Sequence, residues 1–170
     1  MMLMYCLDTN VYIEAHRRYY AFDIAPGFWT GLEQLARNQI ICSPMMVYDE
    51  ISKGKPNDQL TLWSKDNKTH LFIEMDDSTQ EIYKRVADWA AQTYEPQHVQ
   101  TFLDGADPWV IAYAGAHQRI VVTIEVLKKE NVNPNGKIGG EIKIPNVCRH
   151  FQIQYQDTFA LLRDQKIVLR

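Results

Sequence analysis

The sequence lacks any apolar run approaching the roughly 20 residues that a membrane-spanning helix needs. It also lacks the basic start and apolar centre of a cleavable signal peptide, because Asp8 and Asn10 interrupt the first apolar stretch at once. These two absences predict, by default, a cytoplasmic protein with no membrane attachment.

Cysteines are few, and their spacing excludes two classes of protein. Cys6, Cys42 and Cys148 are odd in number and far apart, and none belongs to a C-x-x-C or Cys/His ligand pattern. Neither a disulfide framework nor a zinc site is therefore indicated. Free thiols of this kind are typical of a reducing compartment.

An excess of basic residues is missing as well. The net charge of -3 argues against non-specific binding of duplex nucleic acid over the whole surface. A local basic patch or a site that acts through metal ions stays compatible with that charge. The length of 170 residues, with 46% hydrophobic and 23% charged residues, suits one globular domain over 1–170.

The most informative stretch is the apolar run 3–7, LMYCL. It is too short for a helix and does not alternate, which favours a buried strand of a parallel sheet. Asp8 follows directly, where the crevice at the carboxyl ends of parallel strands binds ligands. The alternative is that Asp8 only caps the next helix, since Asp is a favoured N-cap residue.

Strands and helices alternate along the rest of the chain. Short apolar runs predict strands or extended segments at 40–42, 70–75, 120–122 and 142–144. Helical spacing and capping signals predict helices at 10–18, 28–38, 45–51, 58–65, 78–90, 107–114 and 158–163, with a short one starting at 145. The capping signals are Ser43-Pro44 and Asp107-Pro108, each an N-cap residue followed by a first-turn proline, and Ser78 with Glu81 as a capping box. The stretch 94–101 reads as a loop around Pro96. This alternation predicts an α/β fold, a three-layer α/β/α sandwich around a mostly parallel sheet.

Acidic residues recur at the predicted strand ends and helix starts. The set comprises Asp8, Asp49, Glu50, Asp104, Asp107 and Glu125. Singly, each has a structural explanation as a helix cap or a solvated charge. Together in one crevice they would repel one another, unless Mg²⁺ or Mn²⁺ neutralised them. Such a site can hydrolyse a phosphodiester by polarising a phosphoryl oxygen and activating water.

Four motifs in this order resemble the PIN-domain family of ribonucleases: DTN, YDEI after SP, DPWVIAYA and VVTIE. The resemblance covers a core of about 3–126, and a C-terminal extension of about 141–170 goes beyond it. It implies a compact α/β/α fold whose acids bind Mg²⁺ or Mn²⁺ and cut single-stranded RNA. Many members are toxins of bacterial toxin–antitoxin pairs, which implies a small antitoxin partner and a homodimer.

The resemblance also assigns roles to individual residues. By position, Asp8, Glu50 and Asp107 match the first three metal-binding acids, with Glu50 a better match than Asp49. Glu125 stands where the family usually has Asp, so it is a fourth or water-mediated ligand, and Asp104 can substitute for it. Two polar residues complete the site: Asn10 orients the first acid, and Thr123 positions a water or a carboxylate.

Basic residues lie near the predicted crevice. Arg17 and Arg18 end the helix predicted at 10–18, and Lys53 and Lys55 lie beyond the helix predicted at 45–51. They are the candidates for binding the RNA backbone, and the alternative is that each pair is a solvated basic face.

Other folds with an Asp after the first strand fit less well. Haloacid-dehalogenase-type phosphatases need a second Asp two residues on, where this chain has Asn10. The acids and late Lys of receiver domains are missing, and so is the D-x-S-x-S of adhesion-type metal sites. The strongest alternative is a PIN-like binding or scaffold module without catalysis, which Glu125 in place of Asp keeps open.

Overall fold

A five-stranded, all-parallel sheet forms the centre of the protein. The structure is a computed structural model that describes residues 2–170. The strands are β1 (Tyr5–Leu7), β2 (Ile41–Pro44), β3 (Phe72–Ile73), β4 (Ile120–Val122) and β5 (Tyr155–Gln156). They lie in the order β3-β2-β1-β4-β5, and every pair of neighbours is parallel.

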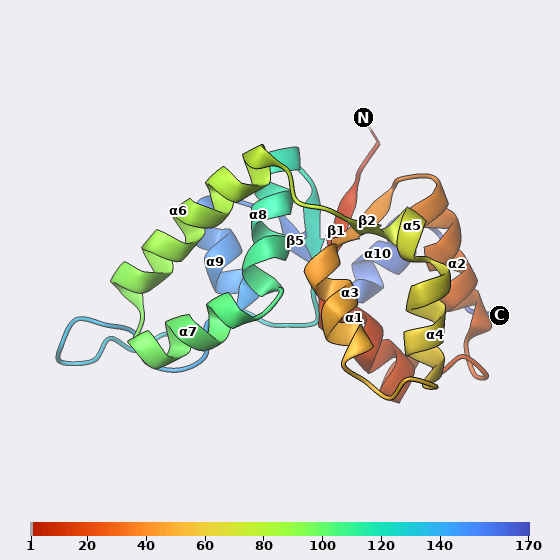
Figure 1. Ribbon diagram of the computed structural model, residues 1–170, viewed down its shortest axis with the longest axis horizontal. Helices are drawn as coiled ribbons and strands as arrows, with labels where there is room; N and C mark the ends of the chain where they lie inside the picture. The colour runs from red at the N-terminus through yellow and green to blue at the C-terminus, as the bar shows by residue number, and fades with distance from the viewer. Residues whose placement is uncertain (1) are drawn as a thin grey trace.

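Helices flank this sheet on both sides. On one side lie α6 (Asp77–Thr93), α7 (Pro96–Asp104), α8 (Asp107–His117) and α9 (Ile144–Phe151) (Figure 1). On the other lie α2 (Pro26–Arg37), α4 (Gln59–Asp66), α5 (Lys68–Leu71) and α10 (Thr158–Asp164) (Figure 1). Two helices lead on from strand ends: α1 (Thr9–Glu14), which passes into the π-helix η1 (Ala15–Tyr19), and α3 (Met45–Ser52). The predicted α/β architecture is confirmed, with a wholly parallel sheet. No helix within residues 2–170 has the length and apolar character to cross a membrane.

The strand order places a topological switch point between β1 and β4. From β1 the chain moves outward to β2 and β3, and then returns to the opposite side of β1 to form β4. In the register of this pair, Leu7 lies beside Val122, so β1 and β4 end together. Asp8 and Thr123 are the residues that follow. Crevices that bind ligands form at such switch points, outside the carboxyl ends of the strands.

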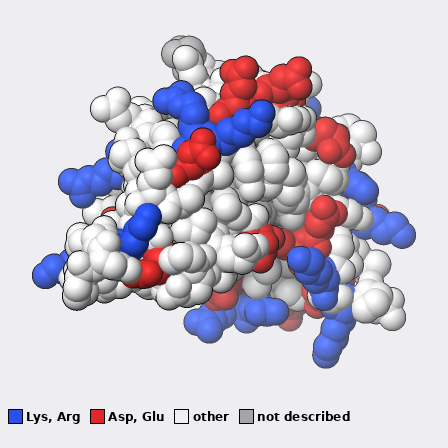
Figure 2. Space-filling view, turned by 60° about the vertical axis from the view of Figure 1, so that its left-hand side comes forward, with Lys and Arg blue, Asp and Glu red and all other residues white. Residues whose placement is uncertain are grey.

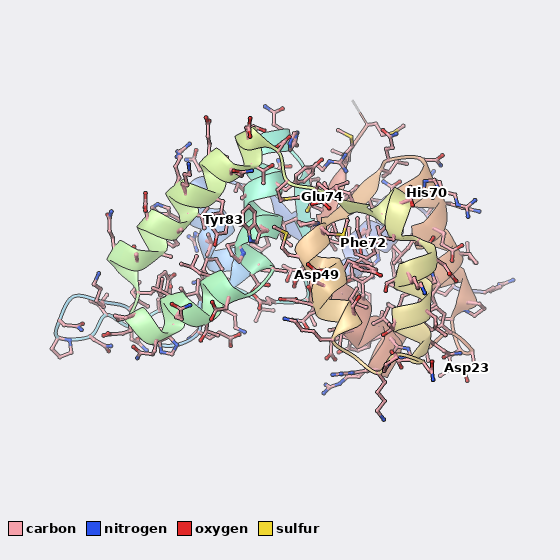
Figure 3. The ribbon with its side chains drawn as sticks, viewed as in Figure 1. Asp23, Asp49, His70, Phe72, Glu74 and Tyr83 are labelled. Atoms are coloured by element: carbon pink, nitrogen blue, oxygen red, sulfur yellow. The ribbon has the colours of Figure 1, made fainter. Side chains whose placement is uncertain are left out.

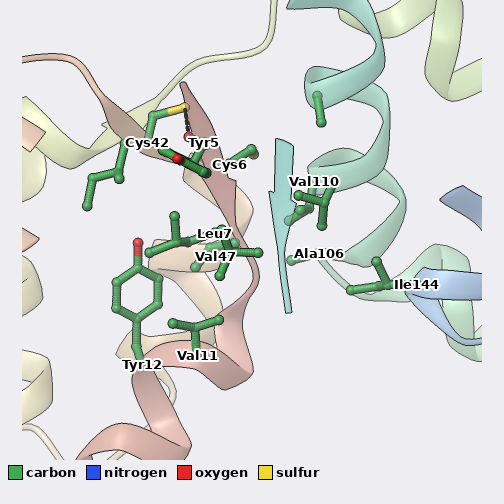
Figure 4. Close-up of a cluster of buried hydrophobic side chains, with 14 of the residues drawn as sticks. Tyr5, Cys6, Leu7, Val11, Tyr12, Cys42, Val47, Ala106, Val110 and Ile144 are labelled. Carbon is green, nitrogen blue, oxygen red and sulfur yellow. Dashed lines mark hydrogen bonds between the residues drawn. The ribbon is translucent and has the colours of Figure 1, made fainter. Parts of the chain in front are cut away.

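β1 is buried on both faces, as its unbroken apolar run predicts. Tyr5, Cys6 and Leu7 are fully buried and pack among side chains from β2, α1, α3 and α8 (Figure 4). The Cys42 thiol donates a weak hydrogen bond to the Tyr5 carbonyl (3.8 Å). The strand ends at Leu7, so Asp8 is the first residue beyond it, next to the core that holds β1 in place.

Several local predictions are wrong. The stretch 94–101 is not a loop, because Pro96 occupies the first turn of α7, where a missing N–H costs nothing. Helix α6 is capped by Asp76, which accepts from the Thr79 N–H (2.9 Å), and not by a Ser78–Glu81 capping box. Ser43 and Pro44 end strand β2, and the N-cap residue of α3 is Pro44 rather than Ser43. Residues 68–71 form α5, so only Phe72 and Ile73 of the run 70–75 are strand.

The C-terminal extension completes one edge of the sheet. It contributes α9, then β5 beside β4, with Val121 in register with Tyr155, and then α10. The Tyr5 hydroxyl donates to Asp164 of α10 (3.2 Å), which ties the extension to β1. A strand at 155–156 was not predicted, because two residues carry too little pattern to be recognised.

Candidate active site

Asp8 lies at the centre of the candidate site and is fully buried. It occupies the N-cap position of α1, yet its side chain makes no capping hydrogen bond. Instead, its Oδ2 accepts from the Thr123 hydroxyl (3.0 Å). Its Oδ1 is buried and has no hydrogen-bond partner among residues 2–170. One oxygen of a buried carboxylate therefore lacks the partner that such a group normally has.

Thr123 owes its position to the pairing of β1 with β4. The Asp8 N–H donates to the Val122 carbonyl (3.0 Å), which holds the two strand ends together. The Thr123 hydroxyl also accepts from the Glu125 N–H (3.1 Å). With its acceptor side occupied by that amide, the hydroxyl is oriented to donate to Asp8.

Glu50 approaches from the second turn of α3 and connects two helix starts. Its Oε2 accepts from the Thr9 hydroxyl (2.5 Å), and its Oε1 accepts from the Ala106 N–H (2.8 Å) just before α8. The neighbouring Asp49 is exposed on α3 (Figure 3). Thr9, the middle residue of DTN, received no role from the sequence, since its contact lies 41 residues away.

Asp107 is the first residue of α8, and the N-cap predicted there is Ala106 instead. Burial raises the pKa of Asp107 to about 8, with a further contribution from the negative charge of Asp8 and then of Glu125 and Glu50. Burial likewise raises the pKa of Asp8 to about 7, helped by the charges of Glu125 and Glu50, whereas the Thr123 hydroxyl and the Asn10 backbone N–H act to lower it. The charges of Glu50 and Glu125 thus act on both Asp8 and Asp107, as expected of carboxyl groups crowded in one region.

Glu125 is held by the C-terminal extension. Its Oε2 accepts from the Ile144 N–H (2.7 Å) at the start of α9, and its Oε1 lies 3.7 Å from the Lys143 ammonium. Lys143 also pairs with Glu141 (2.8 Å). Burial raises the pKa of Glu125, and the Ile144 N–H and Lys143 act against that rise. Sequence reasoning missed Lys143 and Glu141, because a lysine and a glutamate in a loop before a helix carry no spacing signal.

Two residues of the predicted set do not join this region. Asp104 is exposed at the end of α7 and accepts from the Gln100 side chain (2.7 Å). Burial, and to a smaller extent the negative charge of Asp104, raises the pKa of Tyr83 on α6 (Figure 3). Asn10 is exposed on the first turn of α1, and it acts on the pKa of Asp8 through its backbone N–H. The side chain that hydrogen-bonds Asp8 is that of Thr123.

The predicted RNA-binding residues divide into two groups. Arg17 and Lys53 line, together with Glu50, a hollow of about 260 Å³ beside the site. Arg18 pairs with Glu14 (3.0 Å), and Lys55 is exposed in the turn after α3. Acidic and basic side chains are interspersed on the face shown in Figure 2, in keeping with the low net charge. Any attraction for RNA must therefore be local.

The residues present fit a hard divalent cation by donor type and charge. Asp8, Glu50 and Asp107 offer carboxylate oxygens, the ligands that Mg²⁺ and Mn²⁺ prefer, and the Asp8 Oδ1 lacks a partner. As the side chains stand, no three His, Cys, Asp or Glu residues within 2–170 are grouped to hold a metal ion. One reason is that both oxygens of Glu50 already accept hydrogen bonds, from the Thr9 hydroxyl and the Ala106 N–H.

Comparisons with known proteins identify the fold. The model of a family described as "Domain of unknown function (DUF4411)" matches residues 5–169. No curated protein matches the chain. Among solved structures, VapBC2 from Rickettsia felis bound to a promoter DNA fragment is 16% identical, with a TM-score of 0.53 over 91% of this chain and 98% of that one. VapBC-1 from nontypeable Haemophilus influenzae is 15% identical, with a TM-score of 0.54 over 91% and 98%. DNA-bound VapBC from Salmonella typhimurium is 15% identical, with a TM-score of 0.52 over 92% and 98%.

Proposed function

Because the chain belongs to the family described as "Domain of unknown function (DUF4411)" and has the PIN-domain fold, we propose that it is a metal-dependent endoribonuclease. Its substrate is single-stranded RNA, and it is the toxin of a type II toxin–antitoxin pair. The likeness to VapBC structures supports a nuclease of this class. The dependence on metal and the choice of RNA rest on the candidate site.

The observation that carries the proposal is the environment of Asp8. A buried carboxylate with an unpartnered oxygen costs free energy, and neighbouring negative charges increase that cost. A cation that binds there removes both penalties. The location at the switch point between β1 and β4 is where a ligand site is expected in a parallel sheet.

Each residue has a task in the proposed reaction. Asp8, Glu50 and Asp107 would hold Mg²⁺ or Mn²⁺, with Glu125 beside them. A bound cation would supply a Lewis acid for a phosphoryl oxygen and would lower the pKa of a water molecule that serves as the nucleophile. Thr123 orients Asp8, and Thr9 with the Ala106 N–H orients Glu50.

The RNA lies across the hollow beside Glu50 in this proposal. Arg17 and Lys53 line that hollow and are placed to bind phosphate groups of the backbone. Because both side chains end in cations that contact phosphate groups in this proposal, their contribution to binding is electrostatic and depends on salt.

A small antitoxin is the proposed protein partner, as the VapBC neighbours suggest. An apolar hollow of about 270 Å³ opens next to Glu125, lined in part by Tyr19, Ile124, Val126 and Phe159. All four side chains are at least 38% exposed, which is typical of a surface that a partner covers. The homodimer implied by the resemblance stays a prediction.

The test is a cleavage assay on a defined single-stranded RNA with Mn²⁺, comparing wild type with E50Q. D49N is the matched control, since it makes an equivalent charge change one residue away on the exposed face of α3. We expect cleavage by wild type and D49N, loss of cleavage by E50Q, and loss of all activity in EDTA. Activity that survives chelation would exclude the metal mechanism. Absence of both cleavage and Mn²⁺-dependent stabilisation would favour the non-catalytic binding module.

A further inference from the structure

Lys143 introduces a positive charge among the acids of the site. It precedes α9, and its Nζ lies 2.8 Å from a Glu141 oxygen and 3.7 Å from the Glu125 Oε1. Glu141 lines a small hollow of about 70 Å³ together with Asp107. The lysine side chain is 27% exposed, so it is accessible at the rim of the crevice.

The chain around Lys143 is held firmly. Ile144 is fully buried, and its N–H donates to Glu125. Two residues on, the Asn146 side chain donates to the Lys128 carbonyl (2.8 Å) and accepts from the Lys128 N–H (3.0 Å). The backbone directly after Lys143 is therefore anchored, which holds the base of its side chain at the rim of the crevice.

Glu125 and Glu50 differ in the charge of their partners. Both oxygens of Glu50 accept from neutral donors, the Thr9 hydroxyl and the Ala106 amide, which leave its negative charge uncompensated. Glu125 accepts from an amide and also faces the ammonium of Lys143. A Mg²⁺ ion on Glu125 would need an oxygen at about 2.0–2.1 Å and would meet a like charge close by. Glu125 is thus a counter-ion for Lys143 rather than an open ligand.

We propose that Lys143 is a phosphate-positioning residue whose ammonium takes the charge-balancing role of a second divalent cation. The site then holds one cation, through Asp8, Glu50 and Asp107, and Glu125 keeps Lys143 in place. An ammonium is a compact point charge suited to a phosphate oxygen of the substrate. This inference rests on the proposed function, because it concerns the same reaction at the same site.

Two measurements on the whole chain test the proposal. The first is the number of Mn²⁺ ions bound per chain, from electron paramagnetic resonance titration of wild type. The second is the kinetics of RNA cleavage by K143M, K143R and wild type over a range of salt concentrations. K65M is the control, since it removes the same charge from an exposed position on α4. Thermal unfolding establishes that each variant is folded.

We expect one Mn²⁺ ion per wild-type chain. K143M should retain that ion but raise KM on the order of tenfold, since a hydrogen bond to a charged group is lost. The slope of log KM against log salt concentration should also decrease in K143M, by an amount equal to about one phosphate contact. K143R should restore the wild-type slope, and K65M should keep it.

Two Mn²⁺ ions in wild type, or a KM and salt dependence of K143M equal to those of wild type, would overturn the inference and leave the nuclease assignment standing. A wild-type chain that neither binds Mn²⁺ nor cleaves RNA would refute the proposed function itself. The two failures are therefore distinguishable.

Discussion

Replacing Asp8 by Asn should stabilise the metal-free protein while removing its activity. Asn has nearly the shape of Asp, and its side-chain oxygen can still accept from Thr123. The substitution removes a buried negative charge from the vicinity of Glu125 and Glu50, the two residues whose charges raise the pKa of Asp8. A site that binds a cation is expected to gain stability when such a charge is deleted, because the crowded carboxylates that bind the cation repel one another in the metal-free protein.

The size of the effect follows from the pKa of Asp8. Its rise from 3.8 to about 7 corresponds to roughly 4 kcal/mol at a pH well above 7, as an upper value. The side-chain N–H₂ of Asn would be buried with no hydrogen-bond acceptor, which costs about 1–3 kcal/mol and offsets part of this gain. A net stabilisation of about 1–3 kcal/mol at pH 8 is therefore expected. For a chain of 170 residues this raises Tm by several degrees.

The pH dependence gives a sharper check than the size. Because the folded-state pKa of Asp8 is raised, the native protein binds more protons than the unfolded chain between about pH 4 and 7. Wild-type stability should thus fall as pH rises through this window, and D8N should lack that part of the fall. From pKa values of 3.8 and about 7, the advantage of D8N at pH 8 should exceed that at pH 5 by about 2–3 kcal/mol.

Urea unfolding in EDTA at pH 5 and pH 8 measures both quantities. D49N is the control, because an exposed charge on α3 should change the free energy of unfolding by less than about 0.5 kcal/mol. If D8N is less stable than wild type at both pH values, or its advantage is the same at both, the buried carboxylate is not under electrostatic strain. The main argument for a cation site would then be lost.

Three further predictions concern the cation, the threonine and the RNA. Mn²⁺ at a hundredfold excess over its Kd should stabilise wild type by about 2.7 kcal/mol in thermal shift and should leave D8N unchanged; equal shifts in both would mean that the ion binds elsewhere. Thr123→Val should lower the free energy of unfolding at pH 8 by about 1–2 kcal/mol in urea titration, because Asp8 and the Glu125 amide both lose a partner. An unchanged midpoint would show that this hydrogen bond contributes nothing. Arg17→Ala and Lys53→Ala should each weaken RNA binding in fluorescence anisotropy and reduce its salt dependence by about one phosphate contact. Arg18→Ala is the control, because Arg18 pairs with Glu14. Equal effects of all three would indicate a diffuse surface attraction.

The sequence was most informative where local pattern and burial agree. The unbroken run before Asp8 predicted a buried parallel strand, and the chain does place Asp8 at the carboxyl end of β1. The preference for Glu50 over Asp49 as a site residue stays a prediction, although Glu50 faces the region and Asp49 does not. The helix at Pro96 was missed because a proline reads as a loop signal unless the following residues are recognised as a first turn.

The rest of the site depends on contacts between distant parts of the chain. Thr9 reaches Glu50 across 41 residues, and Ile144 reaches Glu125 across 19. No periodicity or capping rule connects such pairs, because tertiary packing alone determines which side chains face one another. The pairing of Lys143 with Glu125 belongs to this class, so the chemistry of the fourth acid was not readable from one sequence.

The dependence of Glu125 on the start of α9 has a consequence for how the protein is made. The amide that holds this carboxylate, the ammonium beside it and the edge strand β5 all come from residues 143–156. During synthesis, Asp8, Glu50 and Asp107 leave the ribosome before these groups do. The crevice therefore reaches its finished form only after residues 143–156 have been released.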